Sequence, residues 1–253
     1  MRKLKLVLGA LALTLLLIVP AAPAQAAEII VSAAGSLTNA FDAVKRNFEA
    51  AYPGVSVVTN YGASGALLKQ MESGAPVDVF ASADQKTMDE AVAKGLVDRA
   101  TRRDFARNSM VLVIPADSKL NLKSAQDLAR PSVARIALGN PDVVPAGRYA
   151  KEFLELSGQW VGPTQKYIFG NNVRQVLDYV TRGEVDAAFV FATDAMQAGA
   201  KVRVLQAADG KTPALYPVAI SATSKKPGAK VFVDYLQSAE GQRILSTFGF
   251  KKP

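Results

Sequence analysis

Hydrophobic and polar positions along the chain follow two alternating patterns. Short apolar runs such as 28–33 and 55–60 read as buried strands, and apolar residues at helical spacing follow each of them. Glycine or proline closes most of the helical stretches, as at Tyr52-Pro53-Gly54. Regular alternation of this kind predicts mostly parallel sheets with helices on both faces.

The elements fall into two consecutive series and a C-terminal tail. In the first series we expect strands at 28–33, 55–60 and 77–81 and helices at 36–51, 65–73 and 84–94. In the second series and the tail we expect strands at 110–115, 136–138, 167–169, 187–191, 202–205 and 216–221, with helices at 124–128, 146–156, 173–181, 194–198, 229–236 and 239–247.

Two series of α/β units predict two lobes. We expect residues 27–108 with 217–253 to form the first lobe and residues 109–216 the second, with the tail packed on the first lobe. The chain then crosses between the lobes near Asn108-Ser109 and again near Tyr216-Pro217. A double crossing forms a hinge, and a hinge between two α/β lobes places a ligand cleft at their interface.

The first 26 residues have the pattern of a secretory signal peptide. Arg2, Lys3 and Lys5 precede an uncharged apolar run, and Ala24-Gln25-Ala26 matches a small-x-small cleavage site. An uncleaved membrane anchor is the alternative, but a spanning helix needs about 20 apolar residues and Pro20 follows the run. We expect export and cleavage after Ala26, which lowers the formal net charge from +8 to +5.

Composition excludes several kinds of chemistry. The chain of 253 residues has no cysteine and no histidine, so it forms no disulfide, carries no lipid on a cysteine and has no serine-histidine triad. An exported protein without a lipid anchor points to a periplasm. The basic residues are scattered rather than clustered, and we expect no nucleic-acid partner.

Four predicted helix starts follow strands and have small or neutral residues at their tips. They are "AAGSLTNAF" with Ser36, "NYGASGALLKQ" with Ser64, "GNPDVVPAGRYAKEF" with Pro145-Ala146-Gly147, and "GNNVRQVLDYV" with Val173 after Asn171-Asn172. Helix N-termini present unpaired N–H donors and the positive end of the dipole. Taken singly, each serine reads as a helix cap, Pro145-Ala146-Gly147 as an ordinary helix start, and Asn171-Asn172 as a turn plus cap. Together they predict an anion site without a charged side chain.

The motifs "AAGSLTNAF", "GASGALLKQMESGAPVDVFASADQKTMD", "GNPDVVPAGRYAKE", "NNVRQVL" and "YPVAI" resemble, in order, those of the periplasmic molybdate-binding proteins of ABC importers. The resemblance implies a type II two-lobed periplasmic solute-binding fold. It also implies that Ser36 and Ser64 donate through hydroxyl and backbone N–H groups, and Ala146 and Val173 through backbone N–H groups. The resemblance implies a metal at these four residues only as part of a molybdate or tungstate oxyanion, and no cofactor is expected. The implied partner is an inner-membrane permease, and we expect a periplasmic monomer.

One position departs from the family pattern. The family usually has a tyrosine in the strand of the segment "AAFVFATDA", where this chain has Phe191. Phenylalanine fills the volume but cannot donate, and losing one hydrogen bond to a charged partner costs about 1.5–3 kcal/mol. Thr193 offers a nearby hydroxyl, although helix capping is its expected role.

Two other readings remain open. The protein could bind another anion, such as sulfate, chromate or a small organic anion, because this fold hosts many ligands. It could also be a periplasmic hydrolase using carboxylates at strand ends or turns, namely Asp78, Asp84, Asp142 and Asp194. We favour a non-enzymatic role, because Asp84 and Asp194 read as helix caps or first-turn acids and carboxylates facing an oxyanion would repel it.

Overall fold

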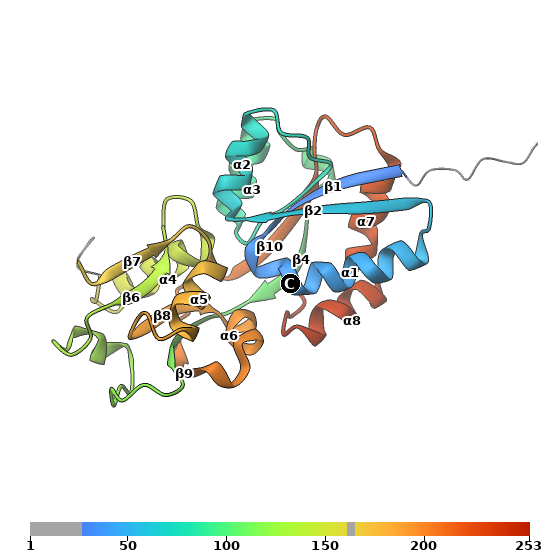
Figure 1. Cartoon of the computed structure of the whole chain (residues 1–253). Coiled ribbons are helices and arrows are strands. Elements are labelled where there is room, and N and C mark those ends of the chain that lie inside the picture. Colours follow the sequence, from blue (N-terminus) through green and yellow to red (C-terminus); the bar gives the residue numbers. More distant parts are fainter. Residues whose placement is uncertain (1–26, 161–164) are drawn as a thin grey trace, which may run out of the picture.

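The computed structural model describes residues 27–160 and 165–253, which form two α/β lobes, each built around a five-stranded sheet (Figure 1). The signal peptide expected at residues 1–26 lies outside the described residues. In the two described ranges, no helix combines the length and the apolar character needed to cross a membrane.

The first lobe contains both the beginning and the end of the described chain. Its strands lie in the order β2-β1-β3-β10-β4. They are β1 (Ala27–Ala34), β2 (Val55–Gly62), β3 (Val79–Ala81), β4 (Arg103–Asn108) and β10 (Ala214–Ile220). Its helices are α1 (Thr38–Ala51), α2 (Ser64–Glu72), α3 (Gln85–Ala93), α7 (Pro227–Gln237) and α8 (Ala239–Thr247).

The second lobe has the strand order β7-β6-β8-β5-β9. Its strands are β5 (Met110–Pro115), β6 (Ile136–Gly139), β7 (Tyr167–Gly170), β8 (Ala187–Phe191) and β9 (Val202–Ala207). Its helices are α4 (Pro145–Leu156), α5 (Val173–Thr181) and α6 (Ala192–Ala198). The chain also forms short 3-10 helices at Gly35–Leu37, Arg99–Thr101, Ala125–Ala129 and Gly199–Lys201.

Both sheets combine parallel and antiparallel pairings. β1 pairs in parallel with β2 and β3, and β6 pairs in parallel with β7 and β8. The strands at the crossings run the other way: β10 is antiparallel to β3 and β4, and β5 is antiparallel to β8 and β9. The α/β two-lobed fold predicted from the sequence is confirmed, with this mixed strand direction as a refinement.

Strand β4 is missing from the strands predicted by the sequence. Its residues, RDFARN, include four polar ones, which hide the β pattern. Phe105 and Ala106 are nevertheless buried, and β10 pairs along the whole strand. Tertiary pairing therefore overrides a weak local preference.

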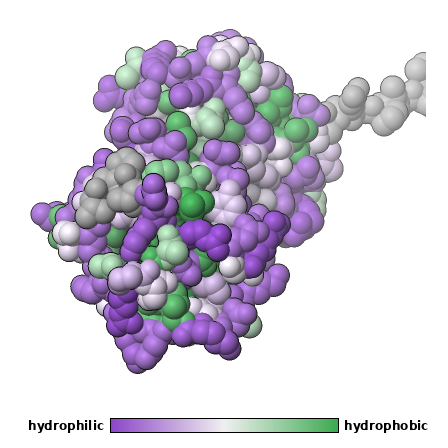
Figure 2. Space-filling view, turned by 60° about the vertical axis from the view of Figure 1, so that its left-hand side comes forward, coloured by the Kyte–Doolittle hydropathy of each residue, from purple (hydrophilic) through white to green (hydrophobic). Residues whose placement is uncertain are grey.

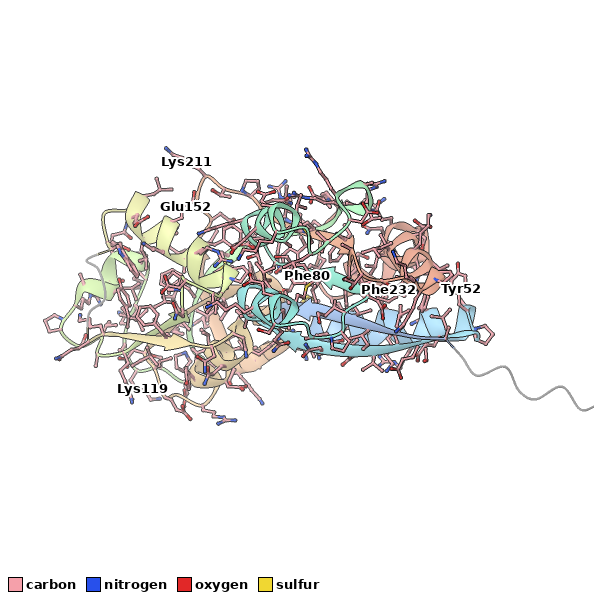
Figure 3. The ribbon with its side chains drawn as sticks, turned by 90° about the horizontal axis from the view of Figure 1, so that it is seen from above. Tyr52, Phe80, Lys119, Glu152, Lys211 and Phe232 are labelled. Carbon is pink, nitrogen blue, oxygen red and sulfur yellow. The ribbon has the colours of Figure 1, made fainter. Side chains whose placement is uncertain are left out.

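Two hydrophobic clusters cover opposite faces of the first sheet. Helices α1, α7 and α8 pack on one face, where Phe232 is fully buried, and α2 and α3 pack on the other, where Phe80 is fully buried. Both side chains lie inside the lobe in Figure 3. Full burial of a side chain of this size contributes about 1.5–3 kcal/mol. The face of the molecule in Figure 2, by contrast, is mainly hydrophilic with small separate apolar areas.

Strand register brings the loops of each lobe to one edge. Ala34 at the end of β1 lies beside Gly62 at the end of β2, and Ala33 lies beside Ala81 at the end of β3. In the second sheet, Gly139 at the end of β6 pairs with Gly170 at the end of β7. Because parallel strands end at the same edge, the turns that follow them face the gap between the lobes.

Candidate functional site

A small cavity lies between the lobes, where four strand-to-helix turns meet. It is lined by Ala34, Gly35, Ser36, Gly62, Ala63, Ser64, Ala83, Val144, Pro145, Ala146, Asn172, Val173 and Phe191. All four residues predicted to bind an anion are in this set. The structure therefore brings together four residues whose sequence positions span 36 to 173.

The two serines of the first lobe are not helix caps. Ser36 lies in the 3-10 turn Gly35–Leu37 before α1, whose cap position is Leu37. Ser64 is the first residue of α2, after Ala63 in the cap position. In neither case does the serine side chain cap the helix, so the single-residue reading of both serines is wrong. Their hydroxyls remain available for contacts at the cavity.

Each serine oxygen has a hydrogen-bond partner behind it. The backbone N–H of Ala83 donates to Ser64 Oγ at 3.0 Å. Ser36 Oγ lies 2.9 Å from the hydroxyl oxygen of Tyr216. An oxygen that already accepts from the protein directs its own proton elsewhere. For Ser64, that leaves the hydroxyl proton available to the cavity.

The second lobe contributes two helix N-termini. Ala146 follows Pro145 in the first turn of α4, and Val173 is the first residue of α5. N–H groups at these positions have no acceptor within their helix. Asn172 caps α5 by accepting from Gln175 N at 3.0 Å, which confirms its predicted role. Proline at the first helical position removes an N–H that would also have lacked a partner.

No charged side chain lines the cavity in the described structure. Arg174, next to Val173, instead donates to the carbonyl oxygens of Gly35 and Ser36, at 3.0 and 3.1 Å. Its Nε also lies 3.1 Å from Oδ1 of Asp194, which is fully buried. Burial raises the pKa of Asp194 to about 6, against the opposing effect of Arg174. The guanidinium group of Arg174 thus interacts with carbonyl and carboxylate oxygens rather than with the cavity.

The lobes touch directly at the cavity. Gly65 N, in α2, donates to the carbonyl oxygen of Val143 at 3.0 Å. A Cβ on Gly65 would lie 2.7 Å from that oxygen, so glycine is required for this approach. Arg148, in α4, pairs with Asp84 of the first lobe at 2.7 Å and donates to Thr87 Oγ1 at 2.8 Å. These contacts define a closed arrangement.

Phe191, where the resemblance implies a tyrosine, lines the cavity. It is 1% exposed, and its ring packs edge-on against Tyr216 and Tyr149, with ring centroids 5.6 and 6.1 Å apart. Thr193 does not cap α6, which begins at Ala192 after Phe191. Its Oγ1 accepts from Asn108 Nδ2 at 2.9 Å, so the predicted cap role of Thr193 is wrong.

None of the four carboxylates considered for hydrolysis lines the cavity. Asp84 caps α3, as predicted, and also holds Arg148. Asp194 lies in the first turn of α6, as predicted, and Asp78 pairs with Lys226 and accepts from Ile30 N. Among the described residues, no group of three His, Cys, Asp or Glu side chains forms a metal site.

Sequence reasoning missed four residues around the cavity: Asn108, Arg148, Arg174 and Tyr216. Asn108 and Tyr216 were identified only as points where the chain crosses between the lobes. The signal that could have identified them is their side chains, since an amide and a phenol at the two crossings can form hydrogen bonds near the cavity. The two arginines lie directly within the helix-start motifs, where their roles depend on the opposite lobe.

The two lobes, the hinge strands and the neutral cavity define a solute-binding protein. Residues 29–251 match the bacterial extracellular solute-binding protein family, and the chain belongs to this family. It is 38% identical over 237 residues to the molybdate-binding protein ModA of Escherichia coli (strain K12), covering 90% of each chain.

Solved structures support the same assignment. The substrate-binding domain of a putative molybdenum ABC transporter from Clostridium difficile is 36% identical, with a TM-score of 0.68 and coverage of 90% of this chain and 100% of that one. The periplasmic molybdate-binding protein of Azotobacter vinelandii shares the fold at 23% identity, with a TM-score of 0.76 and coverage of 89% and 99%. The resemblance drawn from the sequence motifs is confirmed.

Proposed function

We propose that this protein binds molybdate or tungstate in the interlobe cavity and delivers it to an ABC importer. The observation that carries the proposal is the donor set: Ser36, Ser64, Ala146 and Val173 converge on one cavity, and no charged side chain of residues 27–160 or 165–253 lines it. The ligands named for the relatives support the choice of oxyanion.

The donors suit a tetrahedral dianion. Backbone N–H groups at helix N-termini and serine hydroxyls stabilise negative charge without a counter-ion. Phosphate carries a proton at neutral pH, and a site made only of donors leaves that O–H without an acceptor. Sulfate is smaller than molybdate, so donors held at fixed positions discriminate against it by distance.

Closure of the lobes about the crossing strands completes binding. The open form holds the oxyanion on one lobe, and rotation brings the donors of the other lobe into contact with it. The contacts of Gly65 with Val143 and of Arg148 with Asp84 belong to the closed form. The closed protein then docks on its permease.

The protein acts as a periplasmic monomer without catalytic activity. The family is extracellular, and the leader pattern before residue 27 fits export. The neutral cavity lacks a general base and a nucleophile-base pair, which disfavours hydrolysis. Assays with generic phosphate and sulfate esters test that point directly.

Thermal unfolding of the mature chain tests the ligand. Molybdate, tungstate, sulfate, phosphate and chromate are compared in parallel at equal concentration. A ligand at about 1,000 times its Kd adds about 4 kcal/mol to the free energy of unfolding. We expect a large rise in Tm with molybdate and tungstate and none with sulfate. A rise with sulfate alone would reassign the ligand, and no rise with any of the five would overturn the oxyanion proposal.

A further inference from the structure

A chain of buried hydrogen bonds connects the hinge to the cavity. Asn108 Nδ2, at the end of β4, lies 3.2 Å from the hydroxyl oxygen of Tyr216 in β10. That oxygen lies 2.9 Å from Ser36 Oγ, which lines the cavity. Tyr216 is fully buried, and Ser36 and Asn108 are 2% and 5% exposed.

The donor-to-acceptor direction of these hydrogen bonds is fixed at Asn108, the end farthest from the cavity. The backbone N–H of Ser109 donates to Asn108 Oδ1 at 2.9 Å, which identifies that atom as the amide oxygen. Nδ2 therefore faces Thr193 Oγ1 and the Tyr216 hydroxyl, and it has one proton for each. Tyr216 must accept from Asn108.

The same logic applies to the next bond. Because the Tyr216 oxygen accepts from Asn108, its own proton is directed to Ser36 Oγ, the other polar atom bonded to it. Burial raises the pKa of Tyr216, so this proton stays on the phenol at neutral pH. Ser36 Oγ then accepts from the protein, and its hydroxyl proton is left for the cavity.

We propose that Asn108 and Tyr216 are positioning residues that hold the Ser36 hydroxyl as a donor toward the bound oxyanion. They thereby give Ser36 the state that Ala83 N gives Ser64: the serine oxygen accepts from the protein, and its hydroxyl proton points toward the ligand. The inference rests on the proposed function, and it assigns to the hinge a role in ligand selectivity.

Tyr216→Phe removes the donor behind Ser36 and retains the ring that packs on Phe191. By isothermal titration calorimetry we expect the molybdate Kd to rise about three- to tenfold, the effect of one neutral hydrogen bond. The ratio of the phosphate Kd to the molybdate Kd falls, because the Ser36 hydroxyl is no longer held as a donor and can rotate its lone pairs toward the phosphate O–H. The matched control is Tyr149→Phe, whose ring also packs on Phe191 but whose hydroxyl, among the described residues, hydrogen-bonds only to Pro213 O, at 3.5 Å.

A double-mutant cycle separates positioning from general damage. In a Ser36→Ala background, Tyr216→Phe should cost less than twofold in molybdate affinity, because the hydroxyl through which it acts is gone. An equal loss in both backgrounds would overturn the inference. If Tyr216→Phe does not fold, Asn108→Leu carries the same test, with the same direction and a smaller effect.

The outcomes also separate this inference from the proposed function. If the unaltered protein bound none of the anions, the proposed function would fail, and the inference with it. If it bound molybdate while Tyr216→Phe changed neither the affinity nor the selectivity ratio, only the positioning role would be overturned.

Discussion

Arg148 of α4 reaches across the cleft to Asp84 of the first lobe, and its Nε donates to Asp84 Oδ2 at 2.7 Å. Both side chains are largely buried, at 16% and 6% exposure. Asp84 also caps α3, so the ion pair joins a helix of one lobe to the start of a helix in the other. Opening the lobes breaks this pair, which therefore favours the closed state.

Arg148→Met should shift the protein toward the open form. The substitution keeps most of the side-chain stem and removes the charge, so closure loses an interlobe contact. We expect the molybdate Kd to rise about 5- to 30-fold, in the range of typical coupling energies. Small-angle scattering of the ligand-free protein should show a larger radius of gyration. Lys151→Met, in the same helix but paired locally with Glu155, is the control and should change neither quantity.

Ser36→Ala and Ser64→Ala each remove one hydroxyl donor. A hydrogen bond to a charged partner is worth about 1.5–3 kcal/mol, so each variant should bind molybdate about 10- to 150-fold more weakly by calorimetry. Ser64→Ala also leaves Ala83 N without its acceptor, which should lower the unfolding free energy by about 1–3 kcal/mol. Ser73→Ala, at the exposed end of α2, is the control. Wild-type affinity in both cavity variants would exclude the serines from the site.

Val173→Pro removes the backbone N–H donor that the start of α5 presents to the cavity. Proline lacks the N–H but is tolerated at the first position of a helix. The preceding Asn172 is already extended, at φ −159° and ψ 169°, as a residue before proline must be. We expect a 10- to 150-fold loss of molybdate affinity, by about the same 1.5–3 kcal/mol. Val173→Ala keeps the N–H and should retain near-normal affinity; equal losses in both variants would contradict the backbone role.

Phe191→Tyr restores the hydroxyl found in the family pattern. Phe191 already lines the cavity, so a donor added there should tighten molybdate binding by about tenfold, at the low end for a hydrogen bond to an anion. Competition binding against the unaltered protein measures the gain. Phe169→Tyr, on the partly exposed β7, is the control. A weaker or unchanged affinity would mean that the hydroxyl does not reach the ligand.

Asp194 should make the unfolding free energy depend on pH. Its folded-state pKa is about 6, above the ordinary value of 3.8, because burial disfavours the carboxylate. Between these values the folded state binds the proton more tightly than the unfolded state. The contribution of Asp194 to stability is therefore full below about pH 4, falls as the pH rises to about 6 and stays low above that.

Chemical denaturation of Asp194→Asn and the unaltered protein, without ligand, measures this effect. The stability of the variant relative to the unaltered protein should increase by up to about 3 kcal/mol between pH 4 and pH 7. Burial opposes ionisation of Asp78, but hydrogen bonds from Ser224 and Ile30 N outweigh it and lower its pKa; its effect has the opposite sign and is common to both proteins. Asp234→Asn, at an exposed position of α7, gives the baseline. A relative stability that did not change with pH would contradict the raised pKa.

Much of the fold could be predicted from local patterns. Strands such as β8 are uninterrupted apolar runs, and α8 begins and ends at the residues predicted for it. The four turns of the cavity could be found because each has small, proline or neutral polar residues next to a helix start. Local sequence therefore identifies where the chain comes close to a ligand.

The remaining contacts depend on residues distant in sequence. Ser36 and Tyr216 are 180 positions apart, and Arg148 and Asp84 are 64 apart. Ser36 is a residue type typical of helix caps. Its actual partner, Tyr216, comes next to it only when β10 enters the first sheet beside β3. Strand β4 was missed for a related reason, since its polar residues become a strand only through pairing with β10.

The neutral lining of the cavity bears on how the cargo leaves. The field of a dipole falls off more steeply with distance than that of a charge, and it acts only along its axis. A small rotation of one lobe therefore moves half of the donors away from the anion and also turns them out of alignment with it. Nothing of opposite charge in the lining then holds the anion back, and water can take over its solvation. A transporter that pulls the lobes apart needs to supply motion alone, without protons or competing ions.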